Sequence, residues 1–139
     1  MVFKSSISLL LLMCSLTACY EKKSASVELS GLNYTNIWIT NFSVNGYPGH
    51  GVSPNGGGGA FVCCVNIPRE WHSGMRATVR WTKDGDLPDS WNQQVVDVPK
   101  YAAEDISVFA VHFYPDESVK VLVTSKIEGH PDYPYPRPN

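Results

Sequence analysis

Four consecutive glycines, at positions 56–59, lead into a short apolar stretch that ends at a proline. Glycine has no Cβ atom and takes positive φ angles freely, so residues 46–59 are expected to form a long, permissive loop. Residues 61–67 are rich in β-branched and apolar side chains and are stopped by Pro68, which predicts a buried strand. A loop fixed to a rigid strand is a common place for function. The alternative is a turn in which the glycines only satisfy backbone geometry.

The N-terminus carries the pattern of a bacterial lipoprotein signal. A basic residue precedes an apolar core at residues 7–13, which is too short to span a bilayer as a stable helix. Leu16-Thr17-Ala18-Cys19 follows and resembles the lipobox at which such signals are cut. This resemblance implies that residues 1–18 are removed and that Cys19 becomes the lipidated N-terminus. Tyr20 follows the cysteine, and not an aspartate. The resemblance to lipoprotein sorting signals therefore implies a location at the inner leaflet of the outer membrane, with the domain in the periplasm. An ordinary secretory signal is the alternative.

The rest of the chain is expected to form one domain of mainly β class. Residues 19–26 are polar and predict a tether, and residues 27–139 predict a single β-domain with a proline-rich C-terminal tail. Residues 75–82 alternate strictly between apolar and polar side chains, which is typical of a half-buried strand. No stretch has helical periodicity over the roughly 10 residues that a helix needs. We therefore expect a small antiparallel β-sandwich or a curved sheet with long Gly- and Pro-rich loops.

The remaining elements follow from the same patterns. Further strands are expected at residues 27–33, 34–45 and 91–98, a hairpin at 106–114 and 118–125, one helical turn at 101–105, and an extended tail at 129–138.

Composition and motifs argue against several functions. The formal net charge is -2 and no cluster of Lys and Arg interleaves with aromatic residues, so a nucleic-acid partner is not expected. The chain shows no serine-hydrolase elbow, no phosphate loop and no paired histidines with zinc-site spacing. His112 lies in an apolar strand and is expected to be a hydrogen-bonded sheet residue. His130 and Asp132 suggest an acid-base pair, although a turn-stabilising role is the favoured interpretation. We expect no enzyme activity, cofactor, metal or small-molecule substrate.

The adjacent Cys63 and Cys64 allow two interpretations. Consecutive residues of an extended strand point to opposite faces, so the two sulfur atoms are expected to lie apart. A bond between them would interrupt the local strand pairing. We therefore expect two small apolar side chains packed on two faces, and the alternative is a redox or metal site.

Short motifs are spread over nearly all of the mature domain. They are Gly31-x-Asn33-Tyr34-Thr35, Val44-Asn45-Gly46, the four glycines with Val62-Cys63-Cys64-Val65, Ile67-Pro68-Arg69-x-Trp71, Val79-Arg80-Trp81, Val98-Pro99-x-Tyr101, His112-Phe113-Tyr114-Pro115-Asp116 and Gly129-His130-Pro131-Asp132-Tyr133-Pro134. Together they resemble a family of small bacterial lipoproteins that were long described only as a domain of unknown function. Members are often encoded beside phospholipase effectors of type VI secretion systems and resemble the immunity proteins of these effectors.

The resemblance implies a function and a partner. The chain is expected to bind and neutralise a lipase or phospholipase effector in the periplasm, and to contact the membrane through its lipid anchor. The family supplies no catalytic residue and no effector-contact residue. Competing hypotheses are a structural or assembly lipoprotein of the envelope without a toxin partner, and an enzyme that uses His130, Asp132 or the cysteines.

The absence of a catalytic set favours inhibition by occlusion of the lipase surface. Candidate partner-binding residues are Tyr47, Gly56, Gly57, Gly58, Gly59, Arg69 and Trp71. Charge in the loop, as in Gly57→Asp, is expected to weaken binding without loss of the fold. The alternative is that Trp71 fills the core and the loop only closes the sheet.

We expect the mature protein to begin with an acylated Cys19, because a basic segment, a short apolar core and the lipobox-like residues occur in order. Mass spectrometry of the membrane fraction should detect this N-terminus. Cys19→Ser should move a folded domain into the soluble fraction. A mature protein that begins at another residue would contradict the anchor.

Overall fold

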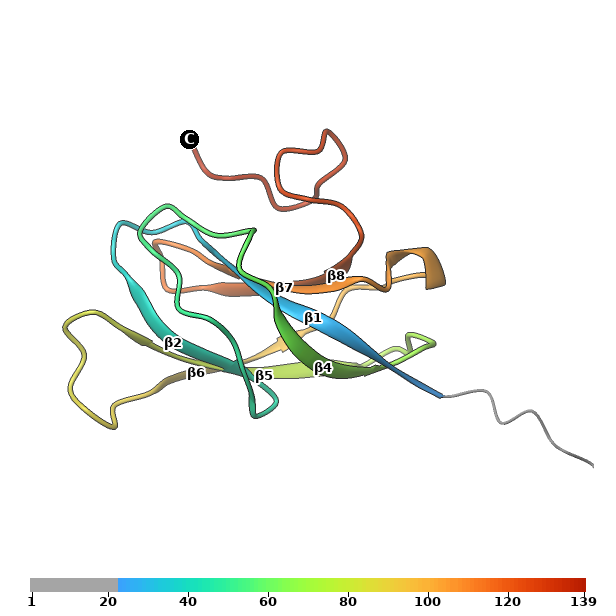
Figure 1. Cartoon of the computed structure of the whole chain (residues 1–139), viewed down its shortest axis with the longest axis horizontal. Helices are drawn as coiled ribbons and strands as arrows, with labels where there is room; N and C mark the ends of the chain where they lie inside the picture. Colours follow the sequence, from blue (N-terminus) through green and yellow to red (C-terminus); the bar gives the residue numbers. More distant parts are fainter. Residues whose placement is uncertain (1–22) are drawn as a thin grey trace, which may run out of the picture.

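The computed structural model describes residues 23–139, which fold as two four-stranded sheets (Figure 1). The prediction for Cys19 lies outside these residues. One sheet has the strand order β4-β1-β7-β8 and the other has the order β3-β2-β5-β6. The elements are β1 (Ser24–Asn33), β2 (Ile39–Val44), β3 (Tyr47–Pro48), β4 (Val62–Pro68), β5 (Arg76–Lys83), β6 (Asn92–Asp97), the 3-10 helix η1 (Ala103–Asp105), β7 (Val108–Phe113) and β8 (Val119–Thr124). The expected mainly β class is confirmed, and the arrangement is that of a small β-sandwich.

The core lies between the two sheets. β5 buries Ala77, Val79 and Trp81 on one face, as its strict alternation predicts. The rings of Phe42 and Phe113 meet edge to face with centroids 5.5 Å apart, which joins β2 of one sheet to β7 of the other. The alternating apolar residues of both sheets therefore form one continuous core.

β1 is a central strand that pairs with β4 in antiparallel and with β7 in parallel orientation. Its first half alternates between exposed and buried residues, whereas its second half is buried on both faces. The strand begins at Ser24, inside the segment expected to be a tether, because Ala25 is buried and pairs with Ile67. The parallel pairing departs from the expected antiparallel sheet.

The expected strand at residues 34–45 is two different elements. Residues 34–38 form a turn that leaves Ile37 and Trp38 largely exposed, and β2 starts only at Ile39. The β7–β8 hairpin, β6 and the short helical turn occur where they were expected. Within residues 23–139, no helix has the length and hydropathy that a membrane span requires.

The sandwich has two distinct ends (Figure 1). We call one of them the loop end. There Asn33, the last residue of β1, pairs with Phe113, the last residue of β7. The start of β2 pairs with the end of β5 at the same end. Four connections lie at this end: the turn 34–38, the loop 49–60, the turn 84–91 and the turn 114–118. The chain enters β1 at the opposite end, which we call the N-terminal end. A ten-residue strand spans about 30 Å.

Candidate functional site

The side chain of Asn33 organises the loop end. It is fully buried at the last position of β1. Its amide makes five hydrogen bonds. Nδ2 donates to the carbonyl oxygens of Ile37 at 2.7 Å, Val52 at 3.2 Å and Ser53 at 3.2 Å. Oδ1 accepts from the backbone N–H of Thr35 at 3.0 Å and from the hydroxyl of Thr35 at 2.7 Å. These bonds tie the turn 34–38 and the loop 49–60 to the end of β1.

The glycine loop is docked against β1. Gly57 forms an isolated β-bridge with Leu32, and the N–H of Gly58 donates to the carbonyl of Gly31 at 3.0 Å. Gly57 has a φ angle of 113°, and a Cβ atom there would overlap the carbonyl oxygen of Gly31. Gly59, in contrast, has free space around it. The expectation that Gly57→Asp preserves the fold is therefore wrong, because this glycine is in backbone contact with β1.

Large apolar side chains are exposed at the loop end. We call this set the loop-end face: Ile37 (42% exposed), Trp38 (47%), Leu87 (76%) and Trp91 (40%). The N–H of Asp84 donates to the carbonyl of Trp38 at 2.9 Å and so joins the turn 84–91 to the turn 34–38. The guanidinium of Arg80 lies 5.1 Å from the centre of the Trp91 ring and holds that side chain by a cation–π contact. Exposed aromatic anchors of this kind are typical of protein-binding surfaces.

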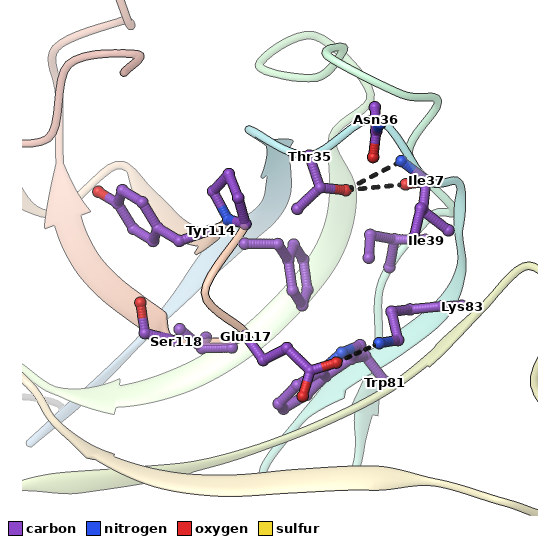
Figure 2. Close-up of a pocket in the computed structure, with 12 residues that line it drawn as sticks. Thr35, Asn36, Ile37, Ile39, Trp81, Lys83, Tyr114, Glu117 and Ser118 are labelled. Atoms are coloured by element: carbon purple, nitrogen blue, oxygen red, sulfur yellow. Dashed lines mark hydrogen bonds and ion pairs between the residues drawn. The ribbon is translucent and has the colours of Figure 1, made fainter. Parts of the chain in front are cut away.

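Three hollows surround this face. The smallest, of about 110 Å³, lies between Thr35, Ile37 and the β7–β8 turn, and Figure 2 shows Lys83 and Glu117 pointing toward each other beside it. These two form an ion pair of 2.5 Å. A cleft of about 350 Å³ separates Trp38 from the glycine loop. Another cleft, of about 330 Å³, separates β2 from Leu87 and the rest of the turn 84–91.

The loop end is acidic. Residues 83–91 and 114–118 together carry five Asp or Glu side chains and one lysine, Lys83. Hydrogen bonds from the hydroxyl and N–H of Ser118 lower the pKa of Asp116, so this carboxylate is ionised at neutral pH. An apolar face among carboxylates fits a partner surface that carries apolar and basic side chains. In the described part of the chain, no three His, Cys, Asp or Glu side chains gather as a metal site would require.

The candidate partner-binding residues do not form one site. Gly56 and Gly58 hydrogen-bond to the final residues of β1, whereas the backbone N–H of Arg69 donates to Lys23 at the other end of that strand. Trp71 is half-buried against the core, and its Nε1 donates to Val98 at 2.9 Å. This supports the alternative that Trp71 has a packing role.

Tyr47 lies on β3, near the edge of the other sheet, where its hydroxyl accepts a hydrogen bond of 3.5 Å from Asn66 on β4. It is separate from the loop-end face. The sequence analysis missed that face, because Ile37 and Trp38 fitted a strand pattern and no function was assigned to the segment between residues 82 and 91. The available signal was a large apolar residue inside a turn rich in Asp, Gly and Pro.

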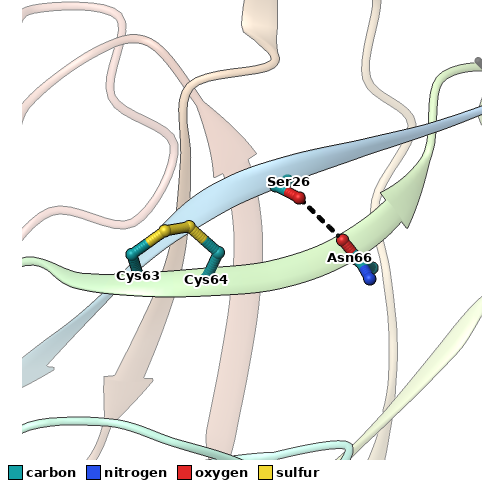
Figure 3. The surroundings of a disulfide bond; sticks show 4 residues. All are labelled: Ser26, Cys63, Cys64 and Asn66. Atoms are coloured by element: carbon teal, nitrogen blue, oxygen red, sulfur yellow. Dashed lines mark hydrogen bonds between the residues drawn. A yellow bond between two sulfur atoms is a disulfide. The ribbon is translucent and has the colours of Figure 1, made fainter.

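Cys63 and Cys64 are joined by a disulfide (Figure 3). The expectation that their sulfur atoms lie apart is wrong. The β1–β4 ladder pairs Val27 with Val65 and the next residue, Glu28, with Cys63, so Cys64 is an extra residue in β4. Such a bulge interrupts the strict alternation of faces. The bonded pair lies on an edge strand, with Cys63 exposed.

The C-terminal tail, residues 125–139, covers part of the outer face of the β4-β1-β7-β8 sheet (Figure 1). His112 on β7 is fully buried beneath it. Because the carbonyl of Lys120 can only accept, His112 donates to it from Nδ1 at 3.0 Å. Nε2 then accepts a hydrogen bond of 2.6 Å from the hydroxyl of Tyr133. His112 is thus a hydrogen-bonded sheet residue, as expected, and burial lowers its pKa to about 4.

The end of the tail reaches the loop end. Arg137 donates from Nη1 to the carbonyl of Asn55 in the glycine loop at 2.7 Å, and its guanidinium lies 4.8 Å from the centre of the Tyr34 ring. The hydroxyl of Tyr34 donates to the carbonyl of Tyr135 at 2.7 Å, and burial raises the pKa of Tyr34 to about 12. Earlier in the tail, His130 Nδ1 accepts the N–H of Asp132 at 3.1 Å, which is the expected turn-stabilising role.

Comparison with known proteins gives one family. The family described as "Protein of unknown function (DUF3304)" matches residues 32–121, which run from the last part of β1 into β8. No curated protein and no solved structure matches the chain.

Gly57→Ala should lower the free energy of unfolding by about 2 kcal/mol, because the new Cβ overlaps β1 and the φ angle is unfavourable for alanine. Gly59→Ala, the matched control, should change it by less than about 0.5 kcal/mol. Urea unfolding of both variants measures the difference. Equal effects would show that the loop is not docked on β1.

Stability should fall as the pH drops from about 6.5 to 4. The unfolded chain protonates His112 near its ordinary pKa of about 6.5, whereas the folded chain keeps it neutral down to about 4. Between these values the unfolded state binds more protons, which removes about 3 kcal/mol of stability. Chemical unfolding at several pH values should show a steeper loss in the wild type than in His112→Gln. An NMR titration with an ordinary pKa for the folded His112 ring would contradict the burial argument.

Proposed function

Because this chain belongs to the DUF3304 family, whose description names no activity, we propose its function from its architecture and motifs. The protein is a periplasm-facing lipoprotein that binds a lipase or phospholipase effector of type VI secretion and neutralises it by occlusion. The choice of a lipase as partner is supported by the resemblance of the motifs to immunity proteins. Two of these motifs build the loop end: Asn33 holds the two loops, and residues 113–115 line the smallest hollow.

The observation that carries this proposal is that the chain enters the domain at one end and exposes its apolar face at the other. The segment with the expected anchor enters β1 at the N-terminal end, and the exposed loop-end face lies at the other end of a strand about 30 Å long. A domain tethered in this way holds its apolar face away from the membrane surface. That face is therefore available to a second protein in the periplasm.

The loop-end face has the features of an occluding surface. Trp38 and Trp91 supply aromatic anchors, and the clefts beside them accept protruding side chains of a partner. The surrounding carboxylates favour a basic partner surface and would speed association at low salt. The loops are held by buried hydrogen bonds, so little conformational entropy is lost on binding.

A titration tests the proposal. The probe is the purified product of the reading frame next to this gene, which we expect to be a lipase. The inhibitor is residues 20–139, which contain every strand of the described part of the chain. Inhibition of phospholipid hydrolysis should be complete at a stoichiometric ratio. Absence of a lipase in the neighbouring frames, or absence of inhibition, would contradict the function and favour an envelope-assembly role. Substoichiometric inactivation would show that the protein acts as an enzyme.

Trp38→Asp should weaken inhibition at least tenfold, which corresponds to about 1.4 kcal/mol of binding free energy. The matched control is Val95→Asp, which changes an exposed apolar residue on β6, outside the loop-end face. Calorimetry gives both dissociation constants, and thermal unfolding verifies that both variants fold. Equal loss in the two variants would place the contact elsewhere on the domain.

A further inference from the structure

A separate cleft of about 220 Å³ lies on the outer face of the β4-β1-β7-β8 sheet. Its floor includes Ser30 of β1 and Ala110 of β7, which pair with each other across the sheet. Phe61 from the glycine loop and Ile127 from the tail also line it, and both are exposed, by 46% and 71%. The cleft lies outside the loop-end face, and the inference below does not depend on the proposed lipase partner.

The hydroxyl of Ser30 has no hydrogen-bond partner among the described residues. Ser30 is only 2% exposed, and such a buried polar group is destabilising unless it is paired. Its neighbours in the cleft include Leu32, Val108 and Ala110, which carry no side-chain polar atom. The hydroxyls of Ser107, Thr124 and Tyr133 also line the cleft but make no hydrogen bond to Ser30, so a polar atom that enters from outside would supply the missing partner.

The size and lining of the cleft select the entering group. A cavity of about 150 Å³ accommodates a benzene ring, so a cleft of about 220 Å³ is large enough for a phenol ring. An acyl chain would place only methyl and methylene groups near Ser30 and would leave its hydroxyl unpaired. A phenol brings an apolar ring to the walls and a hydroxyl to the floor.

We propose that this cleft binds a tyrosine side chain of a partner protein, with the phenol hydroxyl hydrogen-bonded to Ser30. The partner backbone stays at the rim, where Glu28 and Lys126 line the opening with polar and charged groups. The hydroxyl of Ser30 is covered in the unbound domain, so the ring reaches it only after a side chain of the cleft moves aside. We assign this movement to Phe61, because it lines the cleft, is 46% exposed and follows the four glycines, whose backbones adopt a wide range of angles.

The test uses two probes that differ by one hydroxyl, N-acetyl-tyrosinamide and N-acetyl-phenylalaninamide, on residues 20–139. In NMR titrations the tyrosine probe should bind at least fivefold more tightly and should shift the signals of Ser30, Phe61 and Ile127. Ser30→Ala should abolish this preference without lowering the melting temperature of the free domain. Ser43→Ala, on β2 of the other sheet, is the matched control and should keep the preference.

Each other outcome overturns the proposal. Equal affinity for both probes, or an unchanged preference in Ser30→Ala, would show that the hydroxyl is not recognised. Shifts confined to other surfaces, or no binding, would show that the cleft is not a site for this group. A third probe, p-cresol, separates the source: binding of p-cresol without binding of the tyrosine amide would identify a free phenol and not a protein side chain as the ligand.

Discussion

The buried amide of Asn33 is the interaction on which the loop end depends. The turn 34–38 and the loop 49–60 are not regular strands, so their carbonyl groups need partners outside a ladder. Asn33 supplies donors to both segments from the end of a central strand. Arg137 adds a second connection, because it donates to the carbonyl of Asn55 in the same loop. The turn 34–38, the loop 49–60 and the C-terminal tail are thereby fixed to the end of β1, so the exposed apolar residues beside them are held on a rigid base.

This rigidity determines how the loop-end face can act. An irregular segment that orders only on binding loses conformational entropy at that moment, which lowers its affinity. Here the backbone on both sides of Trp38 is already held, by Asn33 through Ile37 and by Asp84 through the carbonyl of Trp38 itself. The aromatic side chain is therefore presented in advance. Such presentation suits an inhibitor that acts by covering a surface, since occlusion needs contact area and no chemistry.

The local elements of this fold could be predicted from the sequence, and their long-range arrangement could not. Alternation in β5 and the turn between β7 and β8 identify these strands because they depend on neighbouring residues. The parallel pairing of β1 with β7 depends on residues about 80 positions apart. Ile37 and Trp38 fit a strand pattern by composition, whereas the hydrogen bonds of Asn33 and Thr35 to Ile37 show that they belong to a turn. Likewise, no sequence pattern placed Arg69 and the glycines at opposite ends of β1.

The glycine loop connects the two candidate binding regions. Gly58 lines the cleft that contains Ser30, and its neighbours Gly57 and Gly59 line the cleft beside Trp38. Gly57 is fixed to β1 by backbone contact, whereas the Cβ position of Gly59 faces open space. Phe61 lies two residues after Gly59, so a ring that displaced Phe61 in the first cleft would act on the same chain segment that lines the second. If that movement changes the affinity of the loop-end face, thermodynamic linkage requires that a partner bound there changes the affinity of the Ser30 cleft by the same factor.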